Sequence, residues 1–232
     1  MEKTSDRPAR LVVVDDHDLV RAGLKAMLSA EPDFEVVGEA SDGQAALEVC
    51  RRENPDLMLM DVRMPRMDGL AATRAIKQRY PKTSVLILTV HENQEYMLEA
   101  IRAGASGYVL KDSPREQLTT AIRKVLDGEV SLNRKLTTAL LQQLARNPER
   151  TRPVDLNPER ERIMQLLTPR EMEVLGLLMK GYTNPKIAET LYISLGTVKN
   201  HVEHIFAKLE VSDRTQAVVK AFELGIISPA DI

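Results

Sequence analysis

The chain has 232 residues, enough for two compact domains, and its hydrophobic content of 43% and charged content of 28% are ordinary for a globular protein. No apolar run approaches the roughly 20 residues that a transmembrane helix needs. The polar N-terminus does not have the pattern of a secretory signal. The single cysteine, Cys50, fits a reducing compartment. We therefore expect a cytoplasmic protein that makes no membrane contact, and a net charge of −2 gives no bulk attraction for nucleic acid.

The first half of the chain alternates short apolar runs with helical patterns. We predict strands over residues 11–14, 34–40, 56–61, 84–89 and 107–111, and helices over residues 18–30, 43–52, 70–79, 94–103 and 114–126. The strands are almost continuously apolar, which is typical of parallel strands covered on both faces. This order predicts a doubly wound α/β domain with a five-stranded parallel sheet, of the flavodoxin-like kind.

Five polar residues follow or end these strands. Asp15 and Asp16 come directly after the first strand, Asp61 ends the third, Thr89 ends the fourth and Lys111 ends the fifth. Because the carboxyl ends of parallel strands lie at one edge of the sheet, we expect these side chains to converge. Crowded carboxylates favour a hard cation such as Mg²⁺ (or Mn²⁺), beside which an aspartate can attack phosphorus.

Each of these residues also has an ordinary structural explanation when it is taken alone. An Asp pair after a strand is most often a helix cap or a turn. Thr89 could cap the next helix, and Lys111 could be a solvated lysine. These explanations do not account for all five residues meeting at the same sheet edge, so the joint pattern favours a site.

The segments VVVDDHDLVR, MDVRMPRMDG, LTVHE and AGASGYVLKD resemble the signature segments of response-regulator receiver domains, over residues 8–128. The resemblance implies that Asp61 is the phospho-acceptor and that Asp15, Asp16, Asp61 and the backbone carbonyl of Arg63 hold the metal. It also implies that Thr89 and Lys111 contact the phosphoryl group.

Further positions in these segments have roles by resemblance. Tyr108 matches the switch aromatic that moves inward with Thr89, although it could equally be a half-buried strand tyrosine. Arg63 and His91 lie where relatives tune the lifetime of the phosphoryl group. Pro65 and Gly69 shape the loop after the acceptor strand, a role that any turn residue could also have.

Residues 129–163 read as a linker with a helical first half, because a helical pattern at 132–145 is followed by a charged segment with three prolines. Residues 164–232 form the second domain. Thr168 followed by Pro169 starts a helix, Asn184 starts a second, Ser194 caps a third that runs to about Leu209, and Asp213 opens a fourth that ends at Gly225.

The third of these helices has a buried stripe and an opposite polar face. The stripe comprises Val198, Val202, Ile205, Phe206 and Leu209. The second and third helices of this domain are short and follow closely on one another, and the third has hydrogen-bonding groups near its start. This arrangement is typical of a helix-turn-helix. A generic four-helix bundle with a solvated polar face fits the periodicity equally well.

The segments LTPREMEVL, IAETLYIS, GTVKNHVEHIFAKL and RTQAV resemble the LuxR-type helix-turn-helix of NarL/FixJ-like regulators, over residues 164–228. The resemblance implies base contacts from Lys199 and Asn200, and dimerisation through the last helix. It implies phosphate contacts from Thr197, His201, Lys208, Arg214 and Thr215. Glu203 departs from the basic or small polar residue common there, and could accept a hydrogen bond from a cytosine amino group.

Together, the resemblances imply a transcription regulator whose dimerisation and binding to double-stranded promoter DNA are controlled by a cognate histidine kinase acting on Asp61. Phosphorylation could instead release a helical domain docked on the receiver. The chain is not expected to be an enzyme beyond its own phosphorylation and dephosphorylation. One alternative is a Mg²⁺-dependent phosphatase or phosphotransferase, and the tethered helix-turn-helix argues against it. The other is a phosphorylation-independent transcription factor, and the intact acidic site argues against that.

Overall fold

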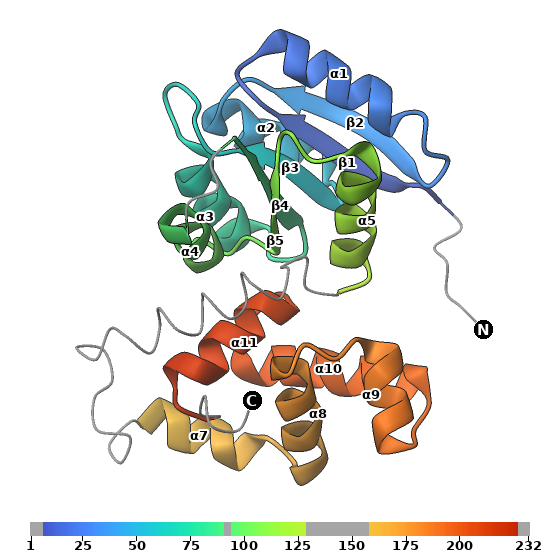
Figure 1. Cartoon of the computed structure of the whole chain (residues 1–232). Helices are drawn as coiled ribbons and strands as arrows, with labels where there is room; N and C mark the ends of the chain where they lie inside the picture. The colour runs from blue at the N-terminus through green and yellow to red at the C-terminus, as the bar shows by residue number, and fades with distance from the viewer. Residues whose placement is uncertain (1–6, 91–93, 129–157, 227–232) are drawn as a thin grey trace. The chain divides into compact units, whose positions relative to one another are not determined.

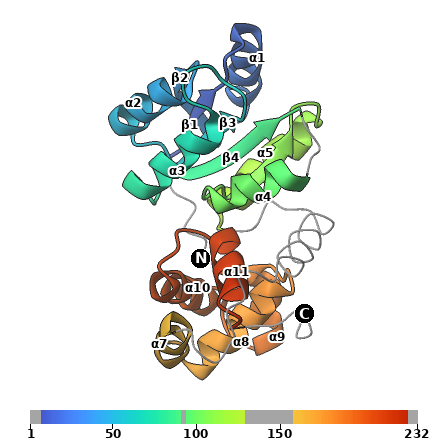
Figure 2. The same ribbon diagram turned by 90° about the vertical axis from the view of Figure 1, so that its left-hand side faces the viewer.

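The structure is a computed structural model that describes residues 7–90, 94–128 and 158–226. The chain divides into two compact units, Met1–Ser131 and Leu132–Ile232. Figures 1 and 2 show the ribbon of the two units in views that differ by 90°. Among the described residues, no helix combines the length and the apolar character that crossing a bilayer requires.

The first unit is built on a five-stranded sheet. Its strands run over β1 (Ala9–Val14), β2 (Phe34–Ala40), β3 (Leu57–Asp61), β4 (Ser84–Thr89) and β5 (Gly107–Leu110). All neighbours pair in parallel, in the order β2-β1-β3-β4-β5. The predicted strands and the parallel sheet are confirmed, and each predicted strand boundary lies within two residues of the observed one.

Five helices cover the sheet, with α1 and α5 on one side and α2, α3 and α4 on the other (Figure 1). They span α1 (Asp18–Leu28), α2 (Gly43–Glu53), α3 (Gly69–Arg79), α4 (Gln94–Arg102) and α5 (Arg115–Leu126). Alternate strand residues such as Leu59 and Leu88 pack with Leu28 of α1 and Ile122 of α5 in one apolar cluster. Burial of both sheet faces explains why the strand sequences are apolar without interruption.

The second unit is helical. Its helices are α7 (Pro158–Leu166), α8 (Pro169–Met179), α9 (Asn184–Leu191), α10 (Leu195–Leu209) and α11 (Arg214–Glu223). The last four begin at side-chain caps in which an oxygen accepts a backbone N–H at the third helical position; the capping residues are Thr168, Thr183, Ser194 and Asp213. These caps account for the close agreement between the predicted and observed starts of the four helices.

The apolar faces of these helices meet in one core. Val198, Val202, Ile205 and Leu209 of α10 are buried there, and Phe206 packs against it, so the predicted stripe is confirmed. One helix was missed: α7 begins at Pro158, inside the predicted linker, and its Ile163 belongs to the same core. Proline is compatible with the first turn of a helix, which needs no N–H donor there. The helix predicted at 132–145 lies outside the described residues.

Candidate functional site

The carboxyl ends of β1 and β3 carry two buried carboxylates. Val14 pairs with Met60, so the residues that follow, Asp15 and Asp61, come from neighbouring strands. Both side chains are buried, whereas that of Asp16 is partly exposed. A parallel sheet thus places acidic groups 46 positions apart in sequence at the same edge.

Lys111 connects these two carboxylates from the end of β5. Its Nζ lies 2.6 Å from Oδ2 of Asp15 and 2.8 Å from Oδ2 of Asp61. Oδ1 of Asp61 accepts a hydrogen bond of 2.8 Å from the backbone N–H of Val62. The convergence of Asp15, Asp61 and Lys111 that the strand ends predict is therefore present in the structure.

Burial and charge act against each other in this cluster. Burial is the largest effect on the Asp61 carboxyl and raises its pKa; the ammonium of Lys111 opposes this, the negative charge of Asp15 adds to the rise, and the net shift is upward. Burial lowers the pKa of Lys111, but the two carboxylates outweigh it and the pKa is raised. One ammonium shared by two carboxylates leaves the cluster with excess negative charge, which favours binding of a cation.

Thr89 ends β4, and Tyr108 lies in the neighbouring strand β5. Ile87 pairs with Tyr108, and alternation along β4 places Ile87 and Thr89 on the same sheet face. Both Thr89 and Tyr108 are buried. Burial raises the pKa of the Tyr108 phenol, which a hydrogen bond to the Thr89 side chain partly offsets. Tyr108 therefore occupies an inward position in this structure, already coupled to Thr89.

The donor set at the sheet edge fits a hard cation. Oδ2 of Asp15 and Oδ1 of Asp16 are buried atoms, and their contacts are to the ammonium of Lys111 and the imidazole of His17. Together with Asp61, these carboxylates outnumber the one ammonium, and carboxylate oxygens are the ligands that a hard cation prefers. His17, which sequence reasoning overlooked, forms a three-residue group of possible metal ligands with Asp15 and Asp16. Its Nδ1 lies 2.8 Å from Oδ1 of Asp16. Asp61 is not part of this three-residue group.

Gly69 lies against the backbone of Asp61. A Cβ atom at Gly69 would be 1.8 Å from the carbonyl oxygen of Asp61, and the backbone N–H of Gly69 donates to the carbonyl of Val62 at 2.9 Å. The start of α3 is therefore packed against the end of β3. The sequence identified Gly69 only as a loop residue, because such a contact requires knowledge of the tertiary structure.

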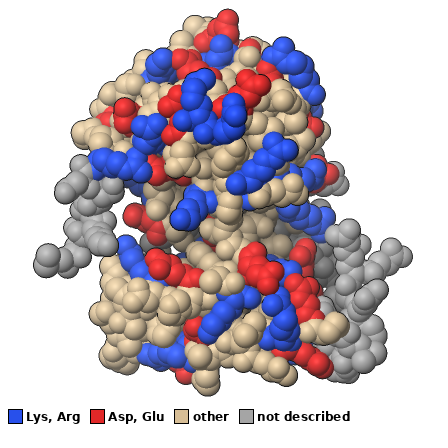
Figure 3. Space-filling model, turned by 180° about the vertical axis from the view of Figure 1, so that it is seen from behind, with Lys and Arg blue, Asp and Glu red and all other residues tan. Residues whose placement is uncertain are grey.

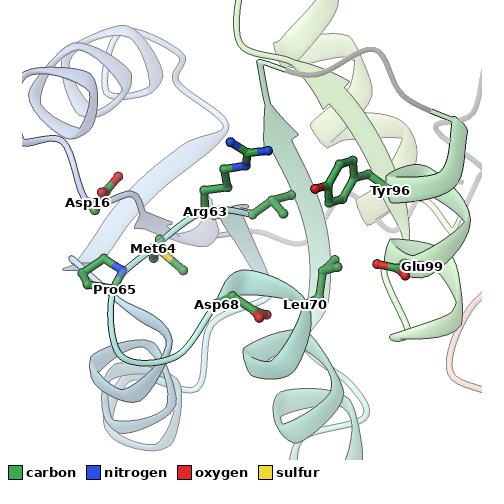
Figure 4. A pocket seen from close by; sticks show the side chains of 9 residues that line it. Asp16, Arg63, Met64, Pro65, Asp68, Leu70, Tyr96 and Glu99 are labelled. Carbon is green, nitrogen blue, oxygen red and sulfur yellow. The ribbon is translucent and has the colours of Figure 1, made fainter.

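The side chain of Arg63 is directed to α4 and not to the acidic cluster. Its guanidinium lies 5.9 Å from the centre of the Tyr96 ring, beside a surface cavity of about 590 Å³ (Figure 4). The cavity is lined by Asp16, Val62, Arg63, Met64, Pro65, Asp68, Leu70, Tyr96 and Glu99. The influence of Arg63 on phosphoryl lifetime stays a prediction, and His91 lies outside the described residues.

The polar face of α10 is open to solvent. Thr197, Lys199, Asn200 and Glu203 are exposed, and His201 is partly exposed. Basic and acidic side chains are interspersed on the face of each unit that Figure 3 shows. Residues 166–232 contain seven Lys and Arg against eight Asp and Glu, so any attraction for DNA depends on where individual charges lie.

Lys208 is held by a buried carboxylate. Its Nζ lies 2.9 and 2.7 Å from the two oxygens of Glu171, which also accepts hydrogen bonds from the backbone and hydroxyl of Thr168. Burial raises the pKa of Glu171, but these contacts outweigh it and the pKa is lowered. A DNA phosphate at Lys208 would have to share the ammonium with Glu171.

Arg214 and Thr215 differ from their predicted role as phosphate ligands. Their exposed fractions are 4% and 2%, and Arg214 donates to the carbonyls of Leu178 at 2.9 Å and Tyr182 at 2.6 Å. The guanidinium is thereby an additional donor to the carbonyl of Leu178, which also accepts from the N–H of Gly181 at 3.0 Å, and a donor to the carbonyl of Tyr182 beyond the end of α8. Both residues are buried in this structure, and their contacts to DNA phosphates stay a prediction.

Family models match both units. Residues 11–123 match the response regulator receiver domain, and residues 165–221 match the bacterial regulatory proteins of the luxR family.

Similar proteins cover nearly the whole chain. It is 40% identical over 229 residues to the transcriptional regulatory protein DegU of Brevibacillus brevis, covering 97% of each chain. It is 39% identical to the oxygen regulatory protein NreC of Staphylococcus haemolyticus, over 94% of this chain and 99% of the relative. Among solved structures, a two-component response regulator of the LuxR family from Aurantimonas sp. SI85-9A1 is 35% identical with a TM-score of 0.55, over 60% of this chain and 99% of that one.

Proposed function

The chain belongs to the NarL/FixJ-like response regulators, which are phosphorylation-dependent DNA-binding transcription regulators of two-component systems, and we propose that Asp61 accepts the phosphoryl group that controls it. The observation that carries this assignment is the pair of contacts from Lys111 to the buried carboxylates of Asp15 and Asp61. A buried pair of carboxylates needs a cationic partner for stability, and phosphoryl transfer needs the same cation beside the nucleophile.

The transfer step joins Asp61 to phosphorus. A carboxylate oxygen of Asp61 attacks the phosphoryl group of a phosphohistidine on the kinase; the new O–P bond forms as the P–N bond breaks, and the imidazole leaves with the electron pair. Lys111 balances charge on the transferring oxygens. The backbone N–H of Val62 holds Oδ1 of Asp61 and so fixes the orientation of the carboxylate.

Mg²⁺ (or Mn²⁺) would be held by Asp15, Asp16, Asp61 and the carbonyl of Arg63. When bound, it neutralises charge on the phosphoryl oxygens. The proximity of Asp15 and Asp16, whose candidate ligand atoms lie within 4.8 Å of one another, supports this set. The ammonium of Lys111 already contacts two of these carboxylates, those of Asp15 and Asp61, and would have to share them with the cation.

Thr89 transmits the modification. Its hydroxyl would turn from Tyr108 toward a phosphoryl oxygen on Asp61, and the hydrogen bond between Thr89 and Tyr108 couples the two residues. Shifting a population from 1:99 to 99:1 requires about 5.5 kcal/mol of preference for the active state. We propose that the active state dimerises on promoter DNA.

DNA binding is assigned to the exposed start and polar face of α10. Lys199 and Asn200 would meet base edges in the major groove, with Thr197, His201 and Lys208 at phosphates. Glu203 on the same face would accept a hydrogen bond from cytosine. A cognate histidine kinase in the cytoplasm would supply the phosphoryl group, and the only reactions of the receiver would be its own phosphorylation and dephosphorylation.

The test compares the full chain before and after incubation with acetyl phosphate and Mg²⁺. DNA sites are selected from a random library, and mass and DNA affinity are then measured. We expect phosphorylation to increase the dimer fraction and the affinity, and an Asp61→Asn variant to show neither change. Incorporation of label into another side chain, or equal responses of the variant and the wild type, would refute the assignment.

A further inference from the structure

The loop between β3 and α3 carries the backbone carbonyl that is proposed to bind the metal. It spans residues 62–68 and includes Arg63, Met64, Pro65 and Asp68, which line the cavity in Figure 4. The N–H of Gly69 closes the loop onto the carbonyl of Val62. The position of the Arg63 carbonyl therefore depends on what holds the rest of this loop.

Asp42 is a buried carboxylate with contacts to two elements. The side chain of Asp42 is 2% exposed and caps α2, with Oδ1 accepting a 2.9 Å hydrogen bond from the N–H of Ala45. Its other oxygen accepts from the guanidinium of Arg66, near the middle of the loop. Although burial raises the pKa of Asp42, Arg66 and the backbone donors outweigh it, so the carboxylate is held ionised.

Arg66 adopts a backbone conformation that an arginine rarely takes. Its φ of 65° lies in the left-handed region, which is unfavourable for a residue with a Cβ. A residue persists in such a conformation when surrounding contacts impose it. The ion pair with Asp42 is a contact of this kind, although the Arg66 side chain is 67% exposed.

The backbones of the β3–α3 loop and the start of α2 are also in direct contact. The N–H of Gly43, next to Asp42, donates to the carbonyl of Met67 at 3.0 Å. A Cβ atom at Gly43 would lie 2.7 Å from Cγ and 2.8 Å from the carbonyl oxygen of Met67. The start of α2 thus supports the β3–α3 loop through one backbone hydrogen bond and one ion pair, and only the ion pair depends on side chains.

We propose that Asp42 and Arg66 form a positioning pair that fixes the β3–α3 loop, and with it the Arg63 carbonyl, for metal binding. This inference rests on the proposed metal site. Neither residue touches the metal or the phosphoryl group; the pair acts through Arg63. Groups that hold metal ligands in place typically change metal affinity by about 10- to 100-fold when they are removed. We expect about tenfold, because the backbone hydrogen bond to Met67 remains.

The experiment measures Mg²⁺ affinity by titration calorimetry and thermal stability of the full chain. Arg66→Gly removes the ion pair and relieves the left-handed strain, so it should weaken Mg²⁺ binding about tenfold while the unfolding midpoint stays the same or rises. Asp42→Asn keeps an acceptor for the N–H of Ala45 and should weaken binding similarly. Because both changes break one contact, the double variant should be no weaker than either single variant.

Two further variants complete the comparison. Arg66→Lys should recover part of the affinity, and Arg74→Ala, which removes an exposed arginine from α3, should bind Mg²⁺ as the wild type does. Unchanged Mg²⁺ affinity in Arg66→Gly and Asp42→Asn would overturn the inference, as would losses that simply add in the double variant. If the wild type itself does not bind Mg²⁺, or if Asp16→Asn binds it equally well, the proposed metal site fails instead.

Discussion

Replacing Gly69 with alanine tests whether the start of α3 fixes the position of Asp61. The added Cβ would lie 1.8 Å from the carbonyl oxygen of Asp61, and real Cβ contacts are essentially never shorter than 3.0 Å. The two backbones must therefore separate by about 1.2 Å, since neither atom belongs to a flexible side chain. Overpacking of this kind typically costs about 1–3 kcal/mol. It outweighs the gain of about 0.5–1 kcal/mol that alanine brings inside a helix.

The same displacement should impair phosphorylation, because a misplacement of about 1 Å at a reacting group can reduce a rate by about 100-fold. Stability is measured by native-state hydrogen exchange of the β3 amides in the full chain, and the rate by labelling with acetyl phosphate and Mg²⁺. We expect Gly69→Ala to lose about 0.5–2 kcal/mol, which is the cost of overpacking less the gain from alanine in the helix, and to react about 10- to 100-fold more slowly.

Gly23 of α1 provides the matched control. A Cβ atom there meets nothing within 4 Å, so Gly23→Ala should be stabilising and should react at the wild-type rate. If Gly69→Ala retains both the stability and the rate of the wild type, the contact between α3 and Asp61 does not constrain the site and the reasoning is wrong.

Four other substitutions give distinct results. Lys111→Met removes the main group that lowers the pKa of Asp61, so carboxyl NMR titration should show a further rise; a fall would contradict the electrostatic account. The lowered pKa of Glu171 gives stability that is present above its ordinary value of 4.5 and lost as pH falls through the folded-state value, so Glu171→Gln should flatten the acid unfolding of the second unit. Arg214→Leu should destabilise that unit by about 1–3 kcal/mol, because the carbonyl of Tyr182 loses its charged donor and that of Leu178 keeps only backbone donors; weaker DNA binding at full stability would support the phosphate role. Glu203→Ala should change the bases selected from a random DNA library, whereas uniformly tighter binding to all sequences would show that Glu203 only repels phosphate.

The backbone of this protein was largely predictable because local sequence and tertiary structure agree. Buried parallel strands must be apolar on both faces, so their limits are visible as apolar runs. Capping residues such as Thr168 and Ser194 mark helix starts because their side chains replace missing backbone partners. Helix α7 was missed because Pro158 and its charged neighbours also have the composition of a linker, and only burial of Ile163 distinguishes the two.

The site was predictable to the extent that topology alone positions it. Asp15, Asp61 and Lys111 converge because each ends or directly follows a strand of one parallel sheet. The order of these strands is a property of the fold class. The second unit offers no comparable rule, since a helix surface does not reveal which neighbour will cover it. Arg214 begins a helix, where an arginine could reach a phosphate, yet the end of α8 lies close enough to bind it first. The contacts of Asp42 and Gly69 escaped prediction for the same reason: each depends on how closely two segments distant in sequence approach, which residue spacing does not determine. For this family member we therefore expect variants at strand ends to act on phosphoryl transfer as the sequence implies, and variants on α10 and α11 to require measurement of stability before any loss of DNA binding is assigned to a contact.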